Sequence, residues 1–323
     1  MTNVLILETY ADDYASALRE VFADLEIQVA RSPADEHVDY GRVEILIAFG
    51  MGITEALFTA MPKLKWVQSL ATGVDHFLRS KTLATDVLLT SGRGLHGAAM
   101  RETVLHLMLS ISRDSVGLVH NMVDRRWERR PWPLLSGKTA VVIGTGVAGS
   151  AIGTLLRAFG MRVVGVSRTL REAEGFDRIV LQSELAEAAA HADYLINVLP
   201  GDVANHNMIG SAVFTAMMPH SYFINVGRGE TVDEPALIAA LSERRIAGAG
   251  LDVFASEALP ARSPLWNLPN VFITPHVGGL FWEYQQLAMP LILHNMRAFL
   301  DDRKQEMTNV VDRSHPKSSE AMT

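Results

Sequence analysis

The sequence changes from a predicted strand to a predicted helix across residues 136–149, which read Ser136-Gly137-Lys138-Thr139-Ala140-Val141-Val142-Ile143-Gly144-Thr145-Gly146-Val147-Ala148-Gly149. The apolar, β-branched run Thr139–Ile143 is typical of a strand buried on both faces, and Ala151–Gly160 keeps helical spacing and ends on glycine. Between them, Gly144 permits a sharp turn, Gly146 lets the backbone approach a pyrophosphate, and Gly149 lets the helix pack closely on the strand. A helix N-terminus favours phosphate through its free N–H groups and its dipole. The stretch therefore predicts a dinucleotide-binding site rather than an ordinary tight turn.

Length and composition exclude several classes of protein. The chain has 323 residues, 48% of them apolar and 20% charged, which predicts two globular domains. Cysteine is absent, which excludes disulfides, thiolate metal sites and a cysteine nucleophile, and suits a reducing cytosol. The net charge of −7 argues against nucleic acid as a partner, and no export or membrane-spanning segment is apparent. We expect a cytoplasmic protein with no nucleic-acid partner, no membrane partner and no metal.

The first part of the chain, up to about residue 96, alternates short apolar runs with amphipathic stretches. Candidate strands are Val4–Leu7, Ile27–Ala30, Glu44–Ala48, Trp66–Ser69 and Val87–Leu89, and candidate helices are Asp12–Phe22 and Thr54–Met61. This alternation predicts a parallel sheet with helices on both faces. A long helix from about Ala98 to Val123 is expected next, bridging two domains or forming a dimer face. The basic cluster Arg125–Arg130 that follows is interpreted as a solvated helix end and loop.

The second series starts at Thr139 and contains six candidate strands, the number expected of a complete dinucleotide fold. They are Thr139–Ile143, Arg162–Val166, Tyr194–Leu199, Tyr222–Val226, Ala249–Val253 and Val271–Thr274. After them, Trp282–Leu300 predicts a helix that returns to the first domain and is kinked or broken at Pro290. The polar tail 314–323 is predicted to be disordered.

Three polar side chains follow strands of the second series. Arg228 lies between two glycines after Tyr222–Val226, Glu257 follows the strand that ends at Val253, and His276 follows Val271–Thr274. Because ligands bind beyond the carboxyl ends of parallel strands, these side chains are expected at one edge of one sheet. A guanidinium can hold a carboxylate and polarise a keto oxygen, an imidazolium can donate a proton, and a carboxylate can orient the ring and favour its protonated form. Together they suit hydride transfer to a 2-keto acid.

With these motifs in the same order along nearly its whole length, the chain resembles the D-2-hydroxyacid dehydrogenase family. The matching motifs are Trp66–Asp75, Glu102 and Arg113 in the interdomain helix, the three glycines, Asn225–Gly229, Leu251–Phe254 with Glu257, and Thr274–His276. The resemblance implies that Arg228 binds substrate, that His276 is the general acid for reduction and that Glu257 assists it. It also implies that backbone N–H groups around Gly73 and Val74 receive the substrate carboxylate and that Asp252 lies near the nicotinamide.

The resemblance implies an α/β fold of two doubly wound parallel-sheet domains. A Rossmann NAD(P)-binding domain, residues 98–284, is expected to be inserted in a flavodoxin-like substrate domain formed by residues 1–97 plus 285–313. Family members are usually homodimers, so a homodimer is expected. The residues expected to bind the cofactor are Gly144, Thr145, Gly146, Val147, Ala148, Gly149, Ser167, Arg168, Thr169, Leu199, Pro200, Val226, Asp252, His276 and Gly278.

The residues after the second strand of this domain bear on the choice between NADP and NAD. An NAD site would place a carboxylate about 20 residues beyond the glycines. Here the sequence reads Ser167-Arg168-Thr169, with Arg171 close by, and a hydroxyl with a guanidinium suits a 2′-phosphate. We expect NADP to be preferred, while NAD remains the alternative if Arg168 is only a surface residue.

Some segments depart from the family's commoner pattern. Pro200–Asn207 lacks the usual threonine beside the cofactor, and Ala258 stands where a proline usually follows the glutamate. Ser91–Gly97 also differs, so Arg93 or His96 could face the substrate or could represent simple loop variation. Trp132 is a candidate to reach a partner subunit's pocket, as an aromatic residue does in some relatives.

The sequence thus predicts an NADP-preferring reductase of small 2-keto acids, with glyoxylate and hydroxypyruvate as the first candidates. Formate dehydrogenases share the architecture but replace the glutamate partner of the histidine, so Glu257 argues against them. A phosphite-type dehydrogenase remains open. A nucleotide-sensing, corepressor-like scaffold without turnover also remains open, because fold does not fix function.

Overall fold

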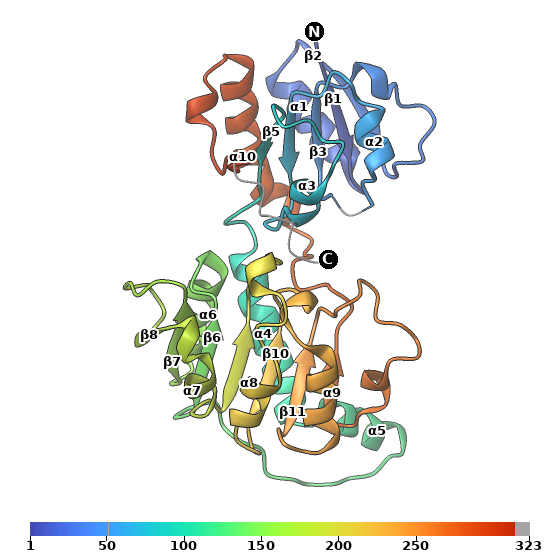
Figure 1. The fold of residues 1–323 in the computed structure, drawn as a ribbon. Helices are drawn as coiled ribbons and strands as arrows, with labels where there is room; N and C mark the ends of the chain where they lie inside the picture. The colour runs from blue at the N-terminus through green and yellow to red at the C-terminus, as the bar shows by residue number, and fades with distance from the viewer. Residues whose placement is uncertain (51, 314–323) are drawn as a thin grey trace. The chain divides into compact units, whose positions relative to one another are not determined.

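The computed structural model describes residues 1–50 and 52–313, so the predicted tail 314–323 lies outside the described residues. The chain divides into two compact units (Figure 1). Unit 1 comprises Met1–His96 and Phe281–Thr323, and unit 2 comprises Gly97–Leu280. In the described ranges, no helix is long and apolar enough to cross a membrane.

Unit 1 contains a parallel sheet of five strands in the order β2-β1-β3-β4-β5. This is the flavodoxin-like order, and it confirms the predicted fold class for this part of the chain. The strands are β1 (Thr2–Leu7), β2 (Leu25–Ala30), β3 (Ile45–Ala48), β4 (Trp66–Ser69) and β5 (Leu88–Thr90). The helices are α1 (Ala11–Val21), α2 (Glu55–Thr59), α3 (Asp75–Arg79) and α10 (Tyr284–Leu300).

Both faces of this sheet are covered, because successive strand residues point to opposite sides. Val4 and Ile6 of β1 pack in one core with α1 and α10, which lie beside each other in Figure 1. Leu5 and Leu7 pack in a second core with residues of α2 and α3. The strands are therefore apolar throughout, as expected for a sheet buried on both faces.

Unit 2 contains a parallel sheet of seven strands in the order β12-β11-β10-β9-β6-β7-β8. Counted within the unit, this is the Rossmann order 3-2-1-4-5-6 with a seventh strand added, which confirms the predicted fold class. The strands are β6 (Thr139–Ile143), β7 (Arg162–Ser167), β8 (Arg178–Leu181), β9 (Tyr194–Asn197), β10 (Tyr222–Asn225), β11 (Gly248–Leu251) and β12 (Val271–Ile273). The helices are α4 (Gly97–Ser112), α5 (Ser115–Val123), α6 (Val147–Ala158), α7 (Leu185–Ala189), α8 (Ser211–Ala216) and α9 (Glu234–Ser242).

The prediction of six strands was wrong, because β8 was missed. This edge strand begins with an exposed arginine and its remaining residues are only partly buried, so its sequence lacks the fully apolar pattern of the inner strands. The other six strands lie where the sequence placed them, with ends that differ by a few residues.

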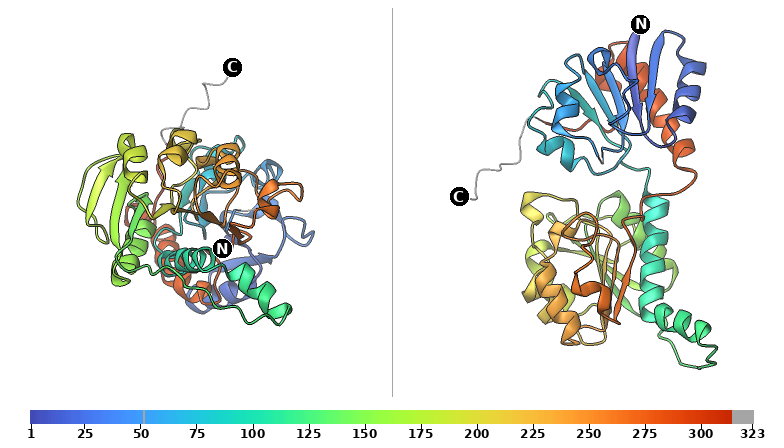
Figure 2. Two further views of the ribbon diagram at one scale, coloured as in Figure 1. Left: turned by 90° about the horizontal axis from the view of Figure 1, so that it is seen from below. Right: turned by 90° about the vertical axis from the view of Figure 1, so that its right-hand side faces the viewer.

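The two faces of the unit 2 sheet are again separate cores. Residues of α4 and α6 pack with Ala140 and Val142 on one face, and residues of α7, α8 and α9 pack with Val141 and Ile143 on the other. Figure 2 shows α4 running alongside the sheet of its own unit. Short 3-10 helices are found at Tyr40–Arg42, Gln182–Glu184, Val203–Asn205, Gly229–Thr231, Pro264–Asn267 and Lys304–Glu306.

The single helix predicted from Ala98 to Val123 is in fact two helices, α4 and α5. Asp114 separates them with a left-handed backbone, at φ 53°. Aspartate tolerates this conformation, and its side chain then caps α5 by accepting a hydrogen bond from Gly117 N at 3.1 Å. Apolar periodicity continues across this break, which is why the sequence suggested one helix.

Helix α10 continues through Pro290, so the alternative of a break at that residue was wrong. A proline inside a helix leaves the carbonyl of the residue four positions earlier without its usual partner. Here that residue is Gln286, and both Gln286 and Pro290 are exposed. Water can therefore solvate the carbonyl, and the helix tolerates the proline.

The segment around α10 is tied to the sheet of unit 1 by a buried amide. Asn295 is fully buried, and its Nδ2 donates to Gln68 Oε1 of β4 at 2.9 Å. Its Oδ1 accepts from Thr308 N at 2.8 Å. Helix α10 and the backbone at Thr308 are thus joined to the sheet of unit 1.

Glu55, the first residue of α2, ties this helix to the loop that follows α3. Its carboxylate accepts hydrogen bonds from Ser80 Oγ at 2.8 Å, from Lys81 N at 3.2 Å and from Thr82 N and Oγ1. The hydroxyls of Thr82 and Ser80 lower the pKa of Glu55 from 4.5 to about 2. Because this pKa is lowered in the folded protein, the stabilisation is present above about pH 4.5 and is lost as the pH falls toward 2.

We predict that Glu55→Gln melts at a lower temperature than wild type near neutral pH, because the amide lacks the charge and one acceptor. The difference in melting temperature between the two proteins should disappear as the pH falls from about 4.5 toward 2, where the wild-type carboxyl is itself protonated. Circular dichroism, recorded during heating at each pH, measures the melting temperatures, and Glu20→Gln on the exposed side of α1 is the control. A gap that does not change with pH would contradict this account.

Candidate active site

The glycine-rich turn joins β6 to α6 in unit 2. Gly144 has a left-handed backbone at φ 111°, which an L side chain rarely adopts, so the turn depends on glycine here. At Gly149, an added Cβ would lie 1.9 Å from the carbonyl oxygen of Gly144, so the helix packs against the turn itself. Gly146 caps α6, and apart from Thr145 and Val147, its neighbours in the chain, no described residue has an atom within 4 Å of a Cβ placed there. Two of the glycines therefore serve the fold, whereas Gly146 borders open space.

This turn is the place where a dinucleotide would bind. Val147 and Ala148 form the first turn of α6, whose N–H groups point out of the helix end. Thr145 is buried, and its carbonyl oxygen accepts a hydrogen bond from Arg171 Nη2 at 2.7 Å. The open space at Gly146 beside a helix N-terminus fits a pyrophosphate.

The end of β7 carries the residues predicted to select the cofactor. Ser167 is half-buried, and Arg168 and Thr169 are exposed after it. The contact of Arg171 with Thr145 brings a second guanidinium to the glycine-rich turn. This end of the site is cationic and contains no carboxylate between Ser167 and Arg171, which fits a phosphate better than a ribose hydroxyl pair.

Arg228 lies in the turn that follows β10. The residue is half-buried, and its Nη1 donates to the carbonyl oxygen of Gly227 at 2.9 Å. The glycines on either side are closely packed, since an added Cβ at Gly227 would lie 2.7 Å from Leu199 O, and one at Gly229 would lie 1.7 Å from Phe254 O. The Gly-Arg-Gly sequence is thus a tightly packed turn and not a loose surface loop.

Asp252 follows β11 and organises the loop that carries His276. Its Oδ1 accepts from Thr274 Oγ1 at 2.6 Å and from Val277 N at 3.0 Å, and its Oδ2 accepts from Gly278 N at 2.9 Å. The residue is 2% exposed, and its carbonyl oxygen also accepts from His276 N at 2.9 Å. These bonds hold His276 in a left-handed conformation at φ 53°, which few non-glycine residues adopt.

His276 and Glu257 form a hydrogen-bonded pair. His276 Nδ1 lies 2.9 Å from Glu257 Oε1, and the two side chains are 34% and 70% exposed. Glu257 comes from the loop after β11, and the next residue, Ala258, has φ 63°. A proline, with φ fixed near −65°, could not adopt this conformation, which gives a physical reason for the departure noted at Ala258.

Sequence reasoning missed a buried polar cluster behind Arg228. Asn197, the last residue of β9, is paired in register with Asn225, the last residue of β10. Asn197 Nδ2 donates to Asn225 Oδ1 at 2.8 Å and to Thr231 Oγ1 at 2.7 Å. Asn225 belongs to the motif Asn225–Gly229 that the sequence had already matched, whereas the only signal for Asn197 is an asparagine inside the apolar run Tyr194–Leu199.

Gly73 and Val74 lie in unit 1, between β4 and α3, and Val74 is the N-cap residue of α3. The preceding residue, Thr72, has its Oγ1 2.9 Å from His96 Nδ1. His96 therefore contacts the predicted substrate loop of its own unit. This contact gives His96, whose role the sequence left open, a place beside that loop.

Two further residues singled out in the sequence, Arg93 and Trp132, have the following surroundings. Arg93 is exposed, and its carbonyl oxygen accepts from Asn309 Nδ2 at 2.8 Å. Trp132 is 48% exposed, with the Arg113 guanidinium 5.6 Å from its ring centroid. Neither observation assigns a ligand to them.

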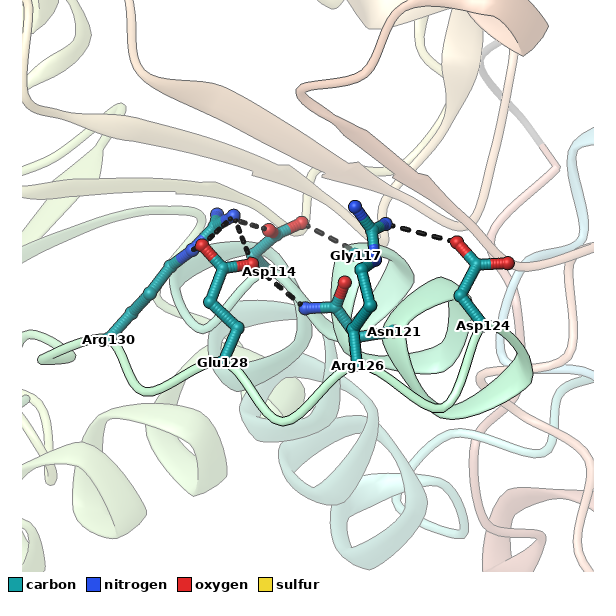
Figure 3. Close-up of polar contacts among 7 residues, drawn as sticks. All are labelled: Asp114, Gly117, Asn121, Asp124, Arg126, Glu128 and Arg130. Carbon is teal, nitrogen blue, oxygen red and sulfur yellow. Dashed lines mark hydrogen bonds and ion pairs between the residues drawn. The ribbon is translucent and has the colours of Figure 1, made fainter.

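The basic cluster after α5 is solvated and ion-paired, as the sequence suggested (Figure 3). Arg130 contacts Glu128 at 2.9 Å and Asp114 at 3.4 Å, and Arg126 contacts Asp124 at 3.1 Å. All of these side chains are 43% exposed or more. Acidic neighbours thus offset the positive charge of Arg126 and Arg130.

Most of the predicted site residues of unit 2 gather at the carboxyl edge of its sheet. Gly144–Gly149 follow β6, Leu199 and Pro200 follow β9, and Val226 and Arg228 follow β10. Asp252 and Glu257 follow β11, and His276 and Gly278 follow β12. An acid–base pair, a guanidinium and a phosphate-binding turn at one sheet edge can bind a dinucleotide and exchange a proton with an oxyanion.

Comparison with known proteins gives consistent results. The sequence model of the family "D-isomer specific 2-hydroxyacid dehydrogenase, NAD binding domain" matches residues 105–278. A glyoxylate/hydroxypyruvate reductase B from Klebsiella pneumoniae is 31% identical over 290 residues, which cover 87% of this chain and 90% of that protein.

Solved structures share the fold over nearly the whole chain. A D-isomer specific 2-hydroxyacid dehydrogenase family protein from Aeromonas salmonicida superposes with a TM-score of 0.88 at 32% identity, covering 97% of this chain and 99% of that one. The NADPH-dependent glyoxylate/hydroxypyruvate reductase from Sinorhizobium meliloti, solved with NADP and sulfate, has a TM-score of 0.83 at 26% identity, covering 98% and 100%.

The two glycines of the turn should respond differently to an added methyl group. Gly149→Ala should lower the melting temperature, because the methyl group meets the Gly144 carbonyl, at a cost of roughly 1–3 kcal/mol. Gly146→Ala should leave the melting temperature near that of wild type, since its methyl group enters open space, yet weaken NADPH binding by about tenfold or more.

Thermal melting and fluorescence titration with NADPH measure the two effects on the same preparations. Wild-type affinity for NADPH in Gly146→Ala would show that no cofactor approaches that backbone.

Proposed function

We propose a substrate and a cofactor preference for this chain, which belongs to the D-isomer specific 2-hydroxyacid dehydrogenase family. As a member of that family it is an NAD(P)-dependent oxidoreductase that acts on the CH–OH group of a 2-hydroxy acid. Its reaction is the transfer of hydride between NADP(H) and a small 2-keto acid. One observation carries the proposal: His276 Nδ1 lies 2.9 Å from Glu257 Oε1 at the carboxyl edge of the unit 2 sheet. Arg228 and the glycine-rich turn lie at the same edge.

The substrates we propose are glyoxylate and hydroxypyruvate. The relative from Klebsiella pneumoniae carries both names, as does the NADPH-dependent reductase from Sinorhizobium meliloti. Both compounds join a carboxylate to a carbonyl, and both are small. The planar guanidinium of Arg228 presents N–H donors that can hydrogen-bond to the carboxylate and the carbonyl.

Arg228 would bind the carboxylate and polarise the keto oxygen, with the backbone N–H groups around Gly73 and Val74 as further carboxylate ligands. The close packing of Gly227 and Gly229 restricts the backbone of the turn. The guanidinium of Arg228 would therefore extend toward the substrate from a backbone held in one position. We assign the substrate-binding part to residues 1–97 plus 285–313 and the NAD(P)-binding part to residues 98–284.

His276 would donate the proton that the reduced oxygen needs and accept it back in the oxidation. Glu257 engages Nδ1 of the ring, so Nε2 would be the nitrogen that exchanges the proton with the substrate oxygen. Glu257 orients the ring and balances the charge of the imidazolium. When bound, the dihydronicotinamide supplies the hydride from its C4 atom.

NADP is the cofactor we propose as preferred, with NAD as the weaker alternative. Gly144–Gly149 would hold the pyrophosphate, and Ser167, Arg168 and Thr169 would bind the 2′-phosphate. Leu199, Pro200, Val226 and Gly278 would line the rest of the cofactor site, with Asp252 near the nicotinamide. The absence of a carboxylate between Ser167 and Arg171 supports this preference.

We also propose that the protein is a cytoplasmic homodimer without nucleic-acid or membrane partners. Helix α5 and the segment after it expose an unusual number of apolar side chains, which is typical of an interface between protein chains. They are Val116, Val119, Met122, Val123, Trp127, Trp132 and Leu134. Arg130 contacts Asp114, the N-cap residue of α5, and Asn121 of α5 donates a hydrogen bond to Glu128, so the segment lies back against α5 (Figure 3).

We predict that His276→Ala lowers kcat for glyoxylate and hydroxypyruvate reduction by at least ~10²-fold, because the proton donor is lost. Binding of NADPH should persist, since the glycine-rich turn is unchanged. The loss of NADPH absorbance measures turnover, and fluorescence titration measures binding. His220→Ala is the control, because His220 precedes β10 and so lies at the opposite edge of the sheet. An unchanged kcat in His276→Ala would remove this residue from the mechanism.

A separate prediction concerns the cofactor. Arg168→Ala should raise the KM for NADPH by about tenfold or more while changing the KM for NADH little, because a charged hydrogen bond to the 2′-phosphate is lost. Arg162→Ala, at the other end of β7, serves as the matched control. The same ratio of NADPH to NADH use in Arg168→Ala and wild type would sink the assignment of the 2′-phosphate to Arg168.

A further inference from the structure

We propose that the buried cluster of Asn197, Asn225 and Thr231 positions Arg228 for substrate and joins this turn to the cofactor side of the site. The inference rests on the proposed function, because it takes Arg228 to bind the keto acid. None of the three side chains is a catalytic group. They act through the backbone on either side of Arg228, and we call them the positioning cluster.

The cluster is deeply buried and hydrogen-bonded. Asn197 and Thr231 are 0% exposed and Asn225 is 2% exposed. The two donor bonds of Asn197 Nδ2 reach Asn225 Oδ1 and Thr231 Oγ1 at 2.8 and 2.7 Å. Removing one partner of such a bond leaves a buried polar atom unsatisfied, so the three side chains fix one another.

The positioning cluster holds the backbone both before and after the arginine side chain. Asn225 Oδ1 accepts from Gly227 N at 3.2 Å, one residue before Arg228. Thr231 Oγ1 donates to the carbonyl oxygen of Arg228 itself at 2.7 Å. The direction in which the guanidinium leaves the turn is therefore set by two side chains that cannot touch the substrate.

The same cluster reaches the predicted cofactor segment. Asn197 Oδ1 accepts from Leu199 N at 3.1 Å, while the Nδ2 of the same amide serves the Arg228 turn. Gly227 packs against this segment, because an added Cβ would lie 2.8 Å from Leu199 N. One amide thus ties the backbone of the predicted cofactor segment at Leu199 to the turn that carries Arg228.

This arrangement matters because a bidentate guanidinium depends on orientation. A carboxylate and a keto oxygen are recognised by the plane of the fork as well as by its charge. A small rotation of the turn would preserve the charge of the guanidinium, but its N–H groups would no longer point at the carboxylate and keto oxygens. The positioning cluster should therefore affect keto acid recognition more than cofactor affinity.

The test compares Thr231→Val, which keeps the volume and removes the hydroxyl, with Thr231→Ser, which keeps the hydroxyl. In Thr231→Val we expect the KM for hydroxypyruvate to rise by about tenfold or more, with the Kd for NADPH within about twofold of wild type. Thr231→Ser should stay within about threefold of wild type for both constants. All measurements are made well below the melting temperature of each variant.

A cluster that only stabilises the fold would lower the melting temperature of Thr231→Val and leave its KM for hydroxypyruvate unchanged, and this result would overturn the inference. An equal rise of the KM for hydroxypyruvate in Thr231→Ser would also overturn the inference, because the methyl group of Thr231, and not its hydroxyl, would then be responsible. Should Thr231→Val fail to fold, Asn225→Ala gives the same readout, since it removes the acceptor of Gly227 N. A wild-type protein without keto acid turnover would instead refute the proposed function itself.

Discussion

The parallel pairing of strands in unit 2 is the constraint on which the site depends. Since all neighbouring strands from β6 to β12 run parallel, their carboxyl ends meet at one edge of the sheet. Residues that are far apart in the sequence, such as Gly144, Arg228 and His276, are brought to that edge by topology alone. Helices on both faces bury the sheet and leave the edge as the place for ligands.

A second layer of constraint fixes the loops at that edge. Asp252 uses both carboxylate oxygens to hold the loop of His276, and Asn197 uses both ends of its amide to hold the turn of Arg228 and the segment at Leu199. His276 adopts an uncommon left-handed backbone within this scaffold. Such strain persists where the surrounding bonds over-determine the conformation, as they do here.

The sequence was sufficient for the parts of the fold that depend on contiguous patterns. The spaced glycines, and Arg228, Glu257 and His276 after apolar runs, could be read directly, because a buried parallel strand is apolar throughout. The edge strand β8 lacked that pattern, and the break at Asp114 lay within continuous apolar periodicity. Asn197 and Thr231 could not be distinguished from strand-end and loop residues, because their role depends on pairing between strands.

The most direct test of the account uses NADPH that carries deuterium at both hydrogen positions of the nicotinamide C4 atom, incubated with the wild-type protein and hydroxypyruvate. The account predicts D-glycerate with deuterium at C2, because hydride passes to the keto carbon while His276 supplies the proton to the oxygen. Chiral chromatography with mass spectrometry identifies the product. NADPH binding without deuterated product, or a product of L configuration, would contradict the central claim.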